Sequence, residues 1–280
     1  MTDIEAIKIR KSVRKYEKRE LSPEIIKEII HFIQNPCKGP FGNETRFIFI
    51  EKPVAKAKEK VRLGTYGFIS NALYFIGGCV EKFEFSEVDY GYCLEKIVIR
   101  LTSMGLGTCW IGGTFNRKDY AKLLDLKPNE TIPAITPVGY KAEDKTLREK
   151  LGLTFTDGSK RYNFDTLFFE ESLNKPLIFD PDDPYHKALE CVRLAPSAVN
   201  KQPWRVIKVG SKYHFYLKRE KITGAPKSTD LQKIDMGIAL SNFKMALNEL
   251  NIRGKWHIHN PNICDLEYII SWIDEIHFMQ

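Results

Sequence analysis

The sequence predicts an α+β protein built from two similar halves. Stretches with apolar residues at helical spacing alternate along the 280 residues with short apolar runs bounded by glycine and proline, which indicates mixed helices and strands. Apolar positions in the second half also repeat those of the first at a spacing of 146 residues. An internal duplication is the economical account of that spacing.

Helical patterns account for much of the first half. Ser22, Pro23 and Glu24 are typical of a helix start, because serine caps backbone N–H groups and proline and an acid suit the first turn. Gly105 and Gly107 end the longest pattern, which begins at Asp89. Helices are expected at 4–9, 23–33, 54–61, 89–104 and 116–124. Strands are expected at 46–50, 73–80, 108–113 and 132–140, the last of them at a sheet edge because prolines interrupt it.

The second half follows the same order. A helical pattern at 184–194 ends before Pro196, because proline disfavours helical geometry at the preceding residue, and a strand pattern follows at 204–209. Asp235 begins a helical pattern as Asp89 does, and Trp256 matches Trp110. The other matched positions are Leu94, Ile97, Leu101, Met104 and Leu106 with Leu240, Phe243, Leu247, Leu250 and Ile252.

The segment between the repeats is rich in charge and poor in periodicity. Residues 141–175 are therefore expected to form an extended arm, whose apolar group at 166–169 lies over the other half. This reading divides the chain into an N-terminal half with its arm, 1–175, and a C-terminal half, 176–280.

One basic cluster is a candidate phosphate site. Arg10, Lys11, Ser12 and Arg14 combine guanidinium forks, a point charge and a hydroxyl, which suit phosphate oxygens. A solvated basic turn is the alternative for this cluster. A second, smaller basic group, Ser159-Lys160-Arg161, fits an ordinary surface better than a binding site.

Two loops are candidates for contact with a flat ligand. In the loop 196–203, Ser197, Asn200 and Gln202 supply short polar groups and prolines fix the path, although an ordinary helix-to-strand turn fits this spacing as well. Gly112 and Gly113 end a strand pattern, and glycine there allows a ligand to approach the backbone closely or simply ends the strand.

The two halves differ where chemistry would occur. The second half has Asp180 to Asp183 in place of the basic cluster, and the first half has Pro36-Cys37-Lys38-Gly39 in place of the polar loop. Each half therefore keeps a different part of a site, and those parts meet once if the halves pack as a pseudo-twofold pair.

Composition narrows the class of protein. The chain has 43 basic and 36 acidic residues, a net charge of +7, with the basic residues spread along its length. This favours a small anionic ligand over nucleic acid.

We expect no membrane span and no signal segment, because no apolar run is long enough. The six cysteines form no C-x-x-C pair, so we expect buried free thiols, no metal site and a reducing cytoplasm.

Taken together, these motifs resemble the nitroreductase family, flavoenzymes that hold FMN at a homodimer interface on an α+β fold with an antiparallel-dominated central sheet. Residues 10–14 resemble its phosphate-binding motif, residues 196–204 its flavin-facing loop, and residues 105–113 its strand after the long helix. Lys160 and Arg161 fall where the family often contacts the FMN phosphate. The duplication departs from the homodimer and implies a branch in which one chain mimics the dimer.

The resemblance implies an FMN-dependent oxidoreductase that takes hydride from NADH or NADPH and passes electrons to a small acceptor such as a nitroaromatic or a quinone. The flavin carries the chemistry, so no catalytic side chain is expected. A flavin-binding protein without turnover, and another reaction on the same scaffold, remain alternatives. The chain is expected to be a monomer with one FMN. The cofactor-binding residues expected are Arg10, Lys11, Ser12, Arg14, Ile111, Gly112, Gly113, Lys160, Arg161, Pro196, Ser197, Asn200 and Gln202.

Overall fold

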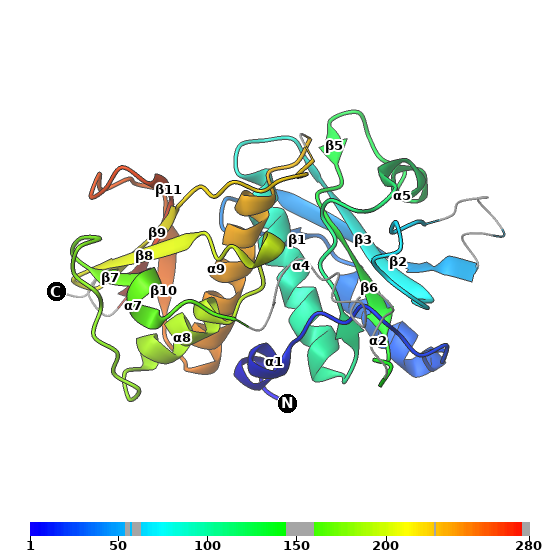
Figure 1. Cartoon of the computed structure of the whole chain (residues 1–280), viewed down its shortest axis with the longest axis horizontal. Helices are drawn as coiled ribbons and strands as arrows, with labels where there is room; N and C mark the ends of the chain where they lie inside the picture. The colour runs from blue at the N-terminus through cyan, green and yellow to red at the C-terminus, as the bar shows by residue number, and fades with distance from the viewer. Residues whose placement is uncertain (54–56, 58–62, 144–159, 227, 276–280) are drawn as a thin grey trace.

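Two sheets lie on either side of a central pair of helices, α4 (Ser86–Ser103) and α9 (Leu231–Glu249) (Figure 1). The structure is a computed structural model that describes residues 1–53, 57, 63–143, 160–226 and 228–275. The α+β class predicted from the sequence is confirmed. The helix expected at 54–61 lies largely outside the described residues, as does Ser159.

The first sheet belongs to the first half of the chain and is antiparallel throughout. Its order is β1-β2-β3-β6-β4, with β5 paired to β3. The strands are β1 (Cys37–Lys38), β2 (Glu44–Glu51), β3 (Tyr74–Glu81), β4 (Gly107–Thr108), β5 (Glu130–Thr131) and β6 (Ile135–Gly139). The expected edge position of β6 is wrong, because β6 lies between β3 and β4. Pro137 is tolerated there since β4 pairs only with Val138 and Gly139, beyond the proline.

The second sheet has the order β10-β11-β9-β8-β7. Its strands are β7 (Phe168–Glu170), β8 (Trp204–Val209), β9 (Lys212–Leu217), β10 (Gly254–His257) and β11 (Glu267–Asp274). Only the pairing of β7 with β8 is parallel within these strands. The apolar group at 166–169 therefore supplies an edge strand of the second sheet, and the boundary expected at residue 175 falls after that strand.

The remaining helices pack against the central pair or against one of the sheets (Figure 1). They are α1 (Asp3–Ile9), α2 (Pro23–Ile33), α5 (Arg117–Leu123), α7 (Phe164–Leu167), α8 (Pro184–Arg193) and the short 3-10 turn η1 (Ala198–Asn200). Ser22 caps α2 as expected, by accepting from the Ile25 backbone N–H. The expected starts of the two long helices are wrong. α4 begins at Ser86, and Asp230 caps α9 by accepting from the backbone N–H groups of Gln232 and Lys233.

One buried apolar cluster runs through both halves and includes residues of α1, α4, α8 and α9. Almost every side chain from Ile234 to Asn242 on α9 is buried, so this helix is enclosed on all sides. The two halves therefore share a core and cannot be separated as independent units. Within the described residues, no helix has the length and apolar character needed to cross a membrane.

The expectation of free thiols is wrong for two of the six cysteines. Cys37 on β1 and Cys93 on α4 form a disulfide, with their Cα atoms 5.9 Å apart. The residues are 56 positions apart, so only the packing of β1 on α4 brings them together. Cys79 and Cys191 are buried thiols, as expected. The disulfide removes the argument for a reducing compartment that rested on free cysteines.

Candidate active site

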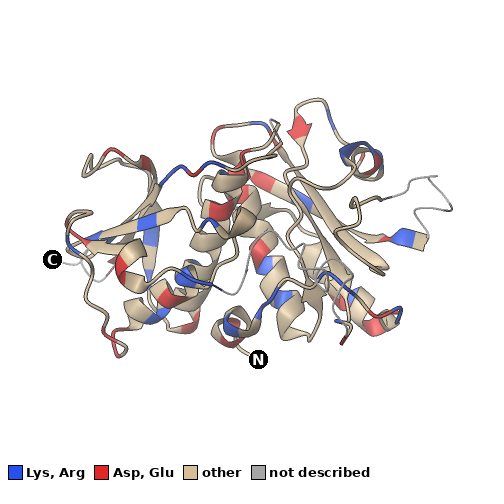
Figure 2. Cartoon of the chain, viewed as in Figure 1, with Lys and Arg blue, Asp and Glu red and all other residues tan. Residues whose placement is uncertain are grey.

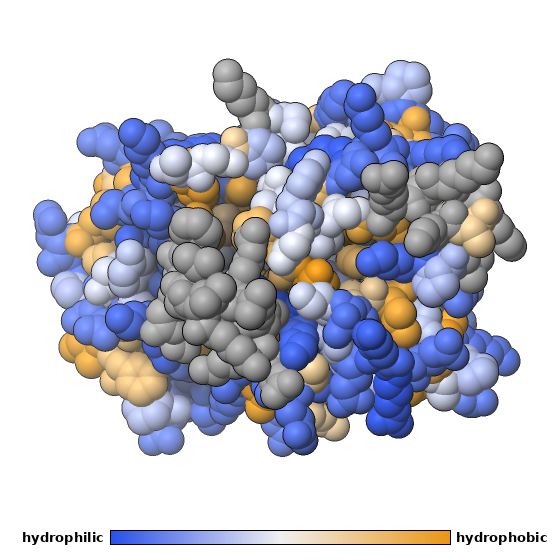
Figure 3. Space-filling view, turned by 45° about the vertical axis from the view of Figure 1, so that its right-hand side comes forward, coloured by the Kyte–Doolittle hydropathy of each residue, from blue (hydrophilic) through white to orange (hydrophobic). Residues whose placement is uncertain are grey.

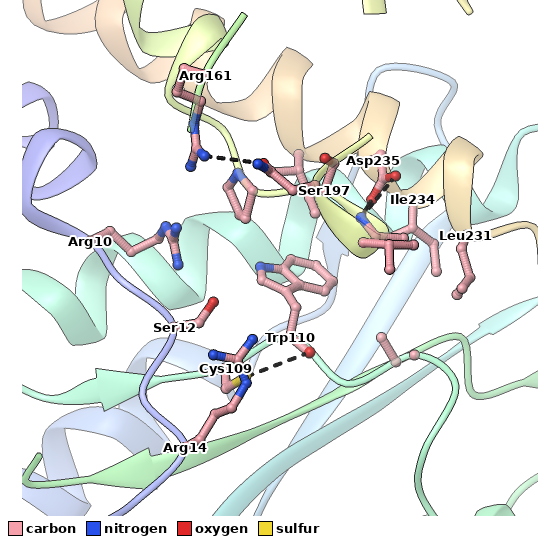
Figure 4. Close-up of a pocket in the computed structure, with 17 residues that line it drawn as sticks. Arg10, Ser12, Arg14, Cys109, Trp110, Arg161, Ser197, Leu231, Ile234 and Asp235 are labelled. Carbon is pink, nitrogen blue, oxygen red and sulfur yellow. Dashed lines mark hydrogen bonds between the residues drawn. The ribbon is translucent and has the colours of Figure 1, made fainter. Parts of the chain in front are cut away.

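A pocket lies between the halves, beside the first turns of α9 (Figure 4). Its walls come from the segment after α1, the segment after β4, the loop after α8 and α9 itself. The lining residues are Arg10, Ser12, Arg14, Cys109, Trp110, Gly112, Ala134, Arg161, Pro196, Ser197, Ala198, Val199, Asn200, Leu231, Ile234, Asp235 and Ile238.

Three arginines give the pocket a strongly cationic end. Arg10 is only 9% exposed, and its Nη1 has no hydrogen-bond partner within the described part of the chain. Burial lowers the pKa of Arg10, and the neighbouring Glu95 acts in the opposite direction. Burial, followed by the charges of Arg10 and Arg193, lowers the pKa of Arg161 to about 10. Like charges held this closely favour an anionic ligand.

The carboxylate of Asp235 lines the same pocket but is already engaged. Its two oxygens accept from the Ala198 backbone N–H at 2.9 and 3.1 Å. Burial raises the pKa of Asp235 well above its ordinary value. Asp235 therefore fixes the loop after α8 and adds little negative charge to the arginine end.

The loop after α8 is held in an uncommon backbone conformation. Val199, Asn200 and Gln202 have positive φ angles of 48°, 56° and 47°. Such angles are rare outside glycine, most of all for a β-branched valine. The Ser197 Oγ accepts from the Gln202 N–H at 2.8 Å, which closes the loop on itself. The loop is thus fixed before any ligand arrives.

The same loop is bound to the segment at 160–162. The Asn200 Nδ2 donates to the Lys160 carbonyl at 2.8 Å, and the Arg161 Nη1 donates to the Asn200 Oδ1 at 3.1 Å. The Arg161 Nη2 also donates to the Leu194 carbonyl at 3.1 Å. These bonds orient the Arg161 guanidinium toward the pocket (Figure 4).

The turn at Gly112 forms the opposite wall. Ile111 exchanges two backbone hydrogen bonds with Ile135, at 3.0 and 2.9 Å, and this fixes the segment before the turn. The Arg117 Nη2 donates to the Gly112 carbonyl at 2.6 Å and also reaches the Thr229 Oγ1 at 3.4 Å. Arg117 therefore links the turn of the first half to a loop of the second half.

Trp110 lies in the middle of the pocket (Figure 4). Its indole Nε1 donates to the Glu95 Oε2 at 2.8 Å. Glu95 is fully buried on α4, and burial raises its pKa to about 7, although Arg10 and the Trp110 hydrogen bond act to lower it. The aromatic wall is thus anchored by a carboxyl group that can change its charge near neutral pH.

The similarity of the chain to known proteins identifies its family. Residues 3–247 match the family model described as "Putative TM nitroreductase". The chain belongs to this nitroreductase family.

A curated relative from Methanothermobacter thermautotrophicus, named "Putative NADH dehydrogenase/NAD(P)H nitroreductase", is 30% identical over 53% of this chain and 82% of that protein. Another from Bacillus subtilis, named "FMN reductase (NADPH)", is 22% identical over 61% of this chain and 78% of that protein.

A solved structure shares the fold over nearly the full length. It is described as that of a "putative nitroreductase" from Thermotoga maritima. Its TM-score is 0.62 at 20% identity, with 98% of this chain and 94% of that chain covered. The nitroreductase fold predicted from the motifs is therefore confirmed over both halves.

Most of the residues expected to bind the cofactor lie at the pocket. The structure brings together Arg10, Ser12, Arg14, Gly112, Arg161, Pro196, Ser197 and Asn200. Lys11 is exposed and lines an outer hollow that shares Arg10, Ser12, Arg14 and Arg161 with the pocket. Figure 2 shows the basic residues along this segment after α1.

Besides Lys11, four expected residues lie outside the pocket lining. Ile111 is buried in the sheet, and Gly113 is exposed beyond the turn. Lys160 is exposed and contributes its carbonyl, which accepts from Asn200. The Gln202 side chain is only 2% exposed, and its Oε1 accepts from the Tyr162 N–H at 2.9 Å. Gln202 therefore shapes the loop instead of facing the cavity.

The sequence patterns did not indicate the other residues that line the pocket. Leu231, Ile234 and Ile238 are apolar positions of α9, where periodicity indicates burial and nothing more. Cys109 follows β4 and Ala134 precedes β6, and both are apolar residues without a chemical signal of their own. Trp110 and Asp235 were noticed only as members of the repeat. Their spacing of 146 residues from Trp256 and Asp89 was the available signal.

The corresponding place in the first half is filled. Asp89 accepts from the backbone N–H groups of Phe41 and Asn43 at 2.9 and 2.7 Å, much as Asp235 holds Ala198. The counterpart of the polar loop is thus residues 39–43, and the expected counterpart at Pro36 to Gly39 is displaced. The Phe41 ring stacks on Phe85 with centroids 4.3 Å apart, and Phe85 is 146 residues before the pocket residue Leu231.

Proposed function

We propose that the protein is an FMN-dependent NAD(P)H oxidoreductase of nitroreductase type that binds one FMN per chain. The observation that carries the proposal is the convergence of Arg10, Arg14 and Arg161 on one end of a pocket whose middle is the Trp110 indole. FMN carries a phosphate at one end and a flat ring system at the other, and these two parts match the cationic end of the pocket and its aromatic middle. The name of the Bacillus subtilis relative, "FMN reductase (NADPH)", supports the choice of cofactor.

The phosphate would be held by the arginines and Ser12. Arg10 has a buried Nη1 without a partner among the described residues, and a phosphate oxygen would satisfy it. Ser12 adds a hydroxyl between Arg10 and Arg14 in the chain. Lys11, in the outer hollow, contributes only charge at longer range.

The ring end would be held by backbone and by short polar groups. Gly112 has no side chain and its carbonyl is fixed by Arg117, so the turn presents rigid backbone to the ligand. Ser197 and Asn200 approach from the second half on a loop fixed by Asp235. The two sides of the ligand therefore meet residues from different halves of the chain.

Bound FMN supplies hydride transfer through its N5 between a nicotinamide donor and an electron acceptor, such as a nitroaromatic or a quinone. The protein contributes binding, orientation and electrostatics. Asp235 is occupied by the Ala198 N–H, which suits a role in positioning the loop and not in proton transfer.

One site per chain follows because each half lacks the part of the site that the other half keeps. Arg10 and Arg14, in the segment after α1, belong to the first half, and the loop 196–203 belongs to the second. Each of these parts is therefore present once. Phe41 and Phe85 occupy the equivalent place in the other half. On the face shown in Figure 3, the described side chains are mainly hydrophilic and the apolar ones lie in small separate patches.

The visible spectrum of the purified full-length protein tests the proposal. We expect flavin absorption, release of FMN on denaturation, and oxidation of NADH or NADPH when a quinone or nitroaromatic is supplied. A yellow protein that oxidises neither nicotinamide would be a flavin carrier instead of an enzyme. A protein that binds neither FMN nor riboflavin would overturn the proposal.

A further inference from the structure

Glu95 is a buried carboxyl group with incomplete hydrogen bonding. It is 0% exposed, and its Oε2 accepts from the Trp110 Nε1 at 2.8 Å. Its Oε1 is buried and has no partner among the residues the structure describes. Burying a carboxylate is costly unless its oxygens are paired, so a half-satisfied one calls for an explanation.

Arg10 is the charged neighbour that interacts electrostatically with Glu95. It too has a buried atom, Nη1, without a partner in the described chain. The two half-satisfied groups are of opposite charge, and Arg10 lines the pocket at its anion-binding end. A phosphate that binds Arg10 therefore competes with the Glu95 carboxylate for the same positive charge.

The corresponding position of the other long helix carries no carboxyl group. The position 146 residues beyond Glu95 is Ser241, which is also 0% exposed, on α9. The indole that corresponds to Trp110 is Trp256. A carboxyl group thus occurs only beside the cationic pocket, whereas a serine fills the same place in the other half.

We propose that Glu95 is a positioning residue that couples phosphate binding to the uptake of one proton. The proposal rests on FMN being the ligand. In the empty pocket the Glu95 carboxylate balances the charge of Arg10. When a phosphate binds Arg10, Glu95 takes up a proton from solvent, so that a second buried negative charge is avoided. No bond of the ligand is made or broken, and Trp110 keeps its hydrogen bond to Glu95.

The electrostatic surroundings give the direction of this coupling. Burial raises the pKa of Glu95 to about 7 while Arg10 acts to lower it, so partial neutralisation of Arg10 by a phosphate raises that pKa further. Other charged or titratable groups near the pair are Cys109, next to Arg10, and Arg14, Arg161 and Asp235, which line the pocket. Asp235 has a raised pKa of its own and is the competing source of proton uptake.

Calorimetric titration of the flavin-free, full-length protein tests the proposal. FMN binding is measured at about pH 7.5, where its phosphate is nearly all dianionic, in buffers of different ionisation heat. We expect net uptake of roughly 0.3 to 1 proton per FMN, and essentially none for riboflavin, which lacks the phosphate. The affinity for FMN should fall roughly 3- to 10-fold between about pH 7 and 9, since one bound proton allows at most about tenfold per pH unit.

The variant Glu95→Gln keeps the shape and the acceptor for Trp110 but cannot titrate. It should bind FMN without proton uptake and with a flat affinity over the same pH range. Uptake that persists in Glu95→Gln would assign the proton to another group such as Asp235 and overturn the proposal. Should that variant not fold, the wild-type titration decides alone, because FMN binding without uptake also overturns it. Failure of both flavins to bind would instead refute the proposed function.

Discussion

Gly91 on α4 lies directly against the backbone carbonyl of Ile234 on α9, where a Cβ atom could not fit. The relationship is reciprocal. Gly237 on α9 lies in the same way against the carbonyl of Val88 on α4, and each residue of the second pair is 146 positions from its counterpart in the first. Exchanged contacts of this kind are what a twofold axis produces between identical subunits. They support the proposed duplication, whose pseudo-twofold axis would lie at the crossing of α4 and α9.

Substitution of either glycine should separate the two helices. Gly91→Ala and Gly237→Ala each place a methyl group onto a backbone carbonyl that cannot rotate away, so each should lower the free energy of unfolding by roughly 1 to 3 kcal/mol, the range for overpacked interiors. Urea denaturation measures this change. Gly64→Ala is the matched control, because a Cβ there meets open space. A loss below about 0.5 kcal/mol for both crossing variants would mean that the helices approach less closely.

The sequence was most informative where apolar spacing and end signals agreed. α2 was predicted at its observed bounds because its apolar stripe coincides with the Ser22 cap and Pro23. The starts of α4 and α9 were misplaced because Asp89 and Asp235 resemble helix caps, whereas their carboxylates bind loops distant in sequence. The Cys37 to Cys93 disulfide depends on the same long-range packing, which local patterns do not encode.

The residues of the site also differ in whether the sequence alone predicts them. Arg10, Ser12 and Arg14 were predictable because consecutive charged and polar residues on a non-helical segment show a chemical function directly. Glu95 was not, since it lies between the apolar residues Leu94 and Ile97 on a helix and its importance comes from Trp110 in a neighbouring element. Gln202 was assigned to the flavin by its motif, but its side chain bonds within the protein: its Oε1 accepts from the Tyr162 N–H, and its Nε2 donates to the carbonyls of Lys160 and Asn200.

The phosphate assignment predicts a selective effect of Arg14. Arg14→Ala should weaken FMN binding by roughly 1.5 to 3 kcal/mol, the scale of a hydrogen bond to a charged group, and should leave riboflavin binding unchanged. Flavin fluorescence quenching measures both affinities. Lys11→Ala is the matched control, because Lys11 is exposed and lines only the outer hollow, so its effect on FMN should be much smaller. Equal losses for FMN and riboflavin would place Arg14 away from the phosphate.

Asn200 should affect the flavin and not the fold. Asn200→Ala removes an acceptor of the Arg161 Nη1 and the donor to the Lys160 carbonyl, so Arg161 loses one of the hydrogen bonds that orient it and keeps the one to Leu194. We expect weaker FMN binding or an altered reduction potential with an unchanged circular dichroism spectrum. Asn251→Ala is a suitable control, since Asn251 also has a positive φ, 57°, but does not line the pocket. A normal flavin spectrum, affinity and turnover in Asn200→Ala would reduce the loop to a structural turn.

Asp89 should make stability depend on pH. Burial raises its pKa from 3.8 to about 6, against the effect of the hydrogen bonds from Phe41 and Asn43. Between these values the folded state binds more protons than the unfolded state, so this contribution is fully present below about pH 4 and is lost as the pH rises through about 6. Asp89→Asn should remove roughly 1 to 3 kcal/mol of that decline, as measured by urea midpoints across the range. An identical pH slope in both proteins would show that Asp89 does not titrate there.

The last prediction is that the protein works as a monomer with one FMN. The arginine cluster and the polar loop come from different halves, and the pocket contains both within a single chain. A second chain would therefore complete no site, and association should add no flavin. The equivalent place in the first half offers no substitute, because the Phe41 and Phe85 rings stack there.

Light scattering with flavin quantitation tests this arrangement. We expect a species of 32.4 kDa that carries one FMN. Truncation after Lys175 should abolish FMN binding, because it removes the Ser197 and Asn200 loop and α9 from the pocket and leaves β7 without its partner β8. As a control for general damage, removal of residues 276–280 should leave the stoichiometry unchanged, since the pocket lining lies between Arg10 and Ile238. Two FMN per chain, or a flavin lost when an obligate dimer dissociates, would contradict the single shared site, because either result requires residues that one chain supplies only once.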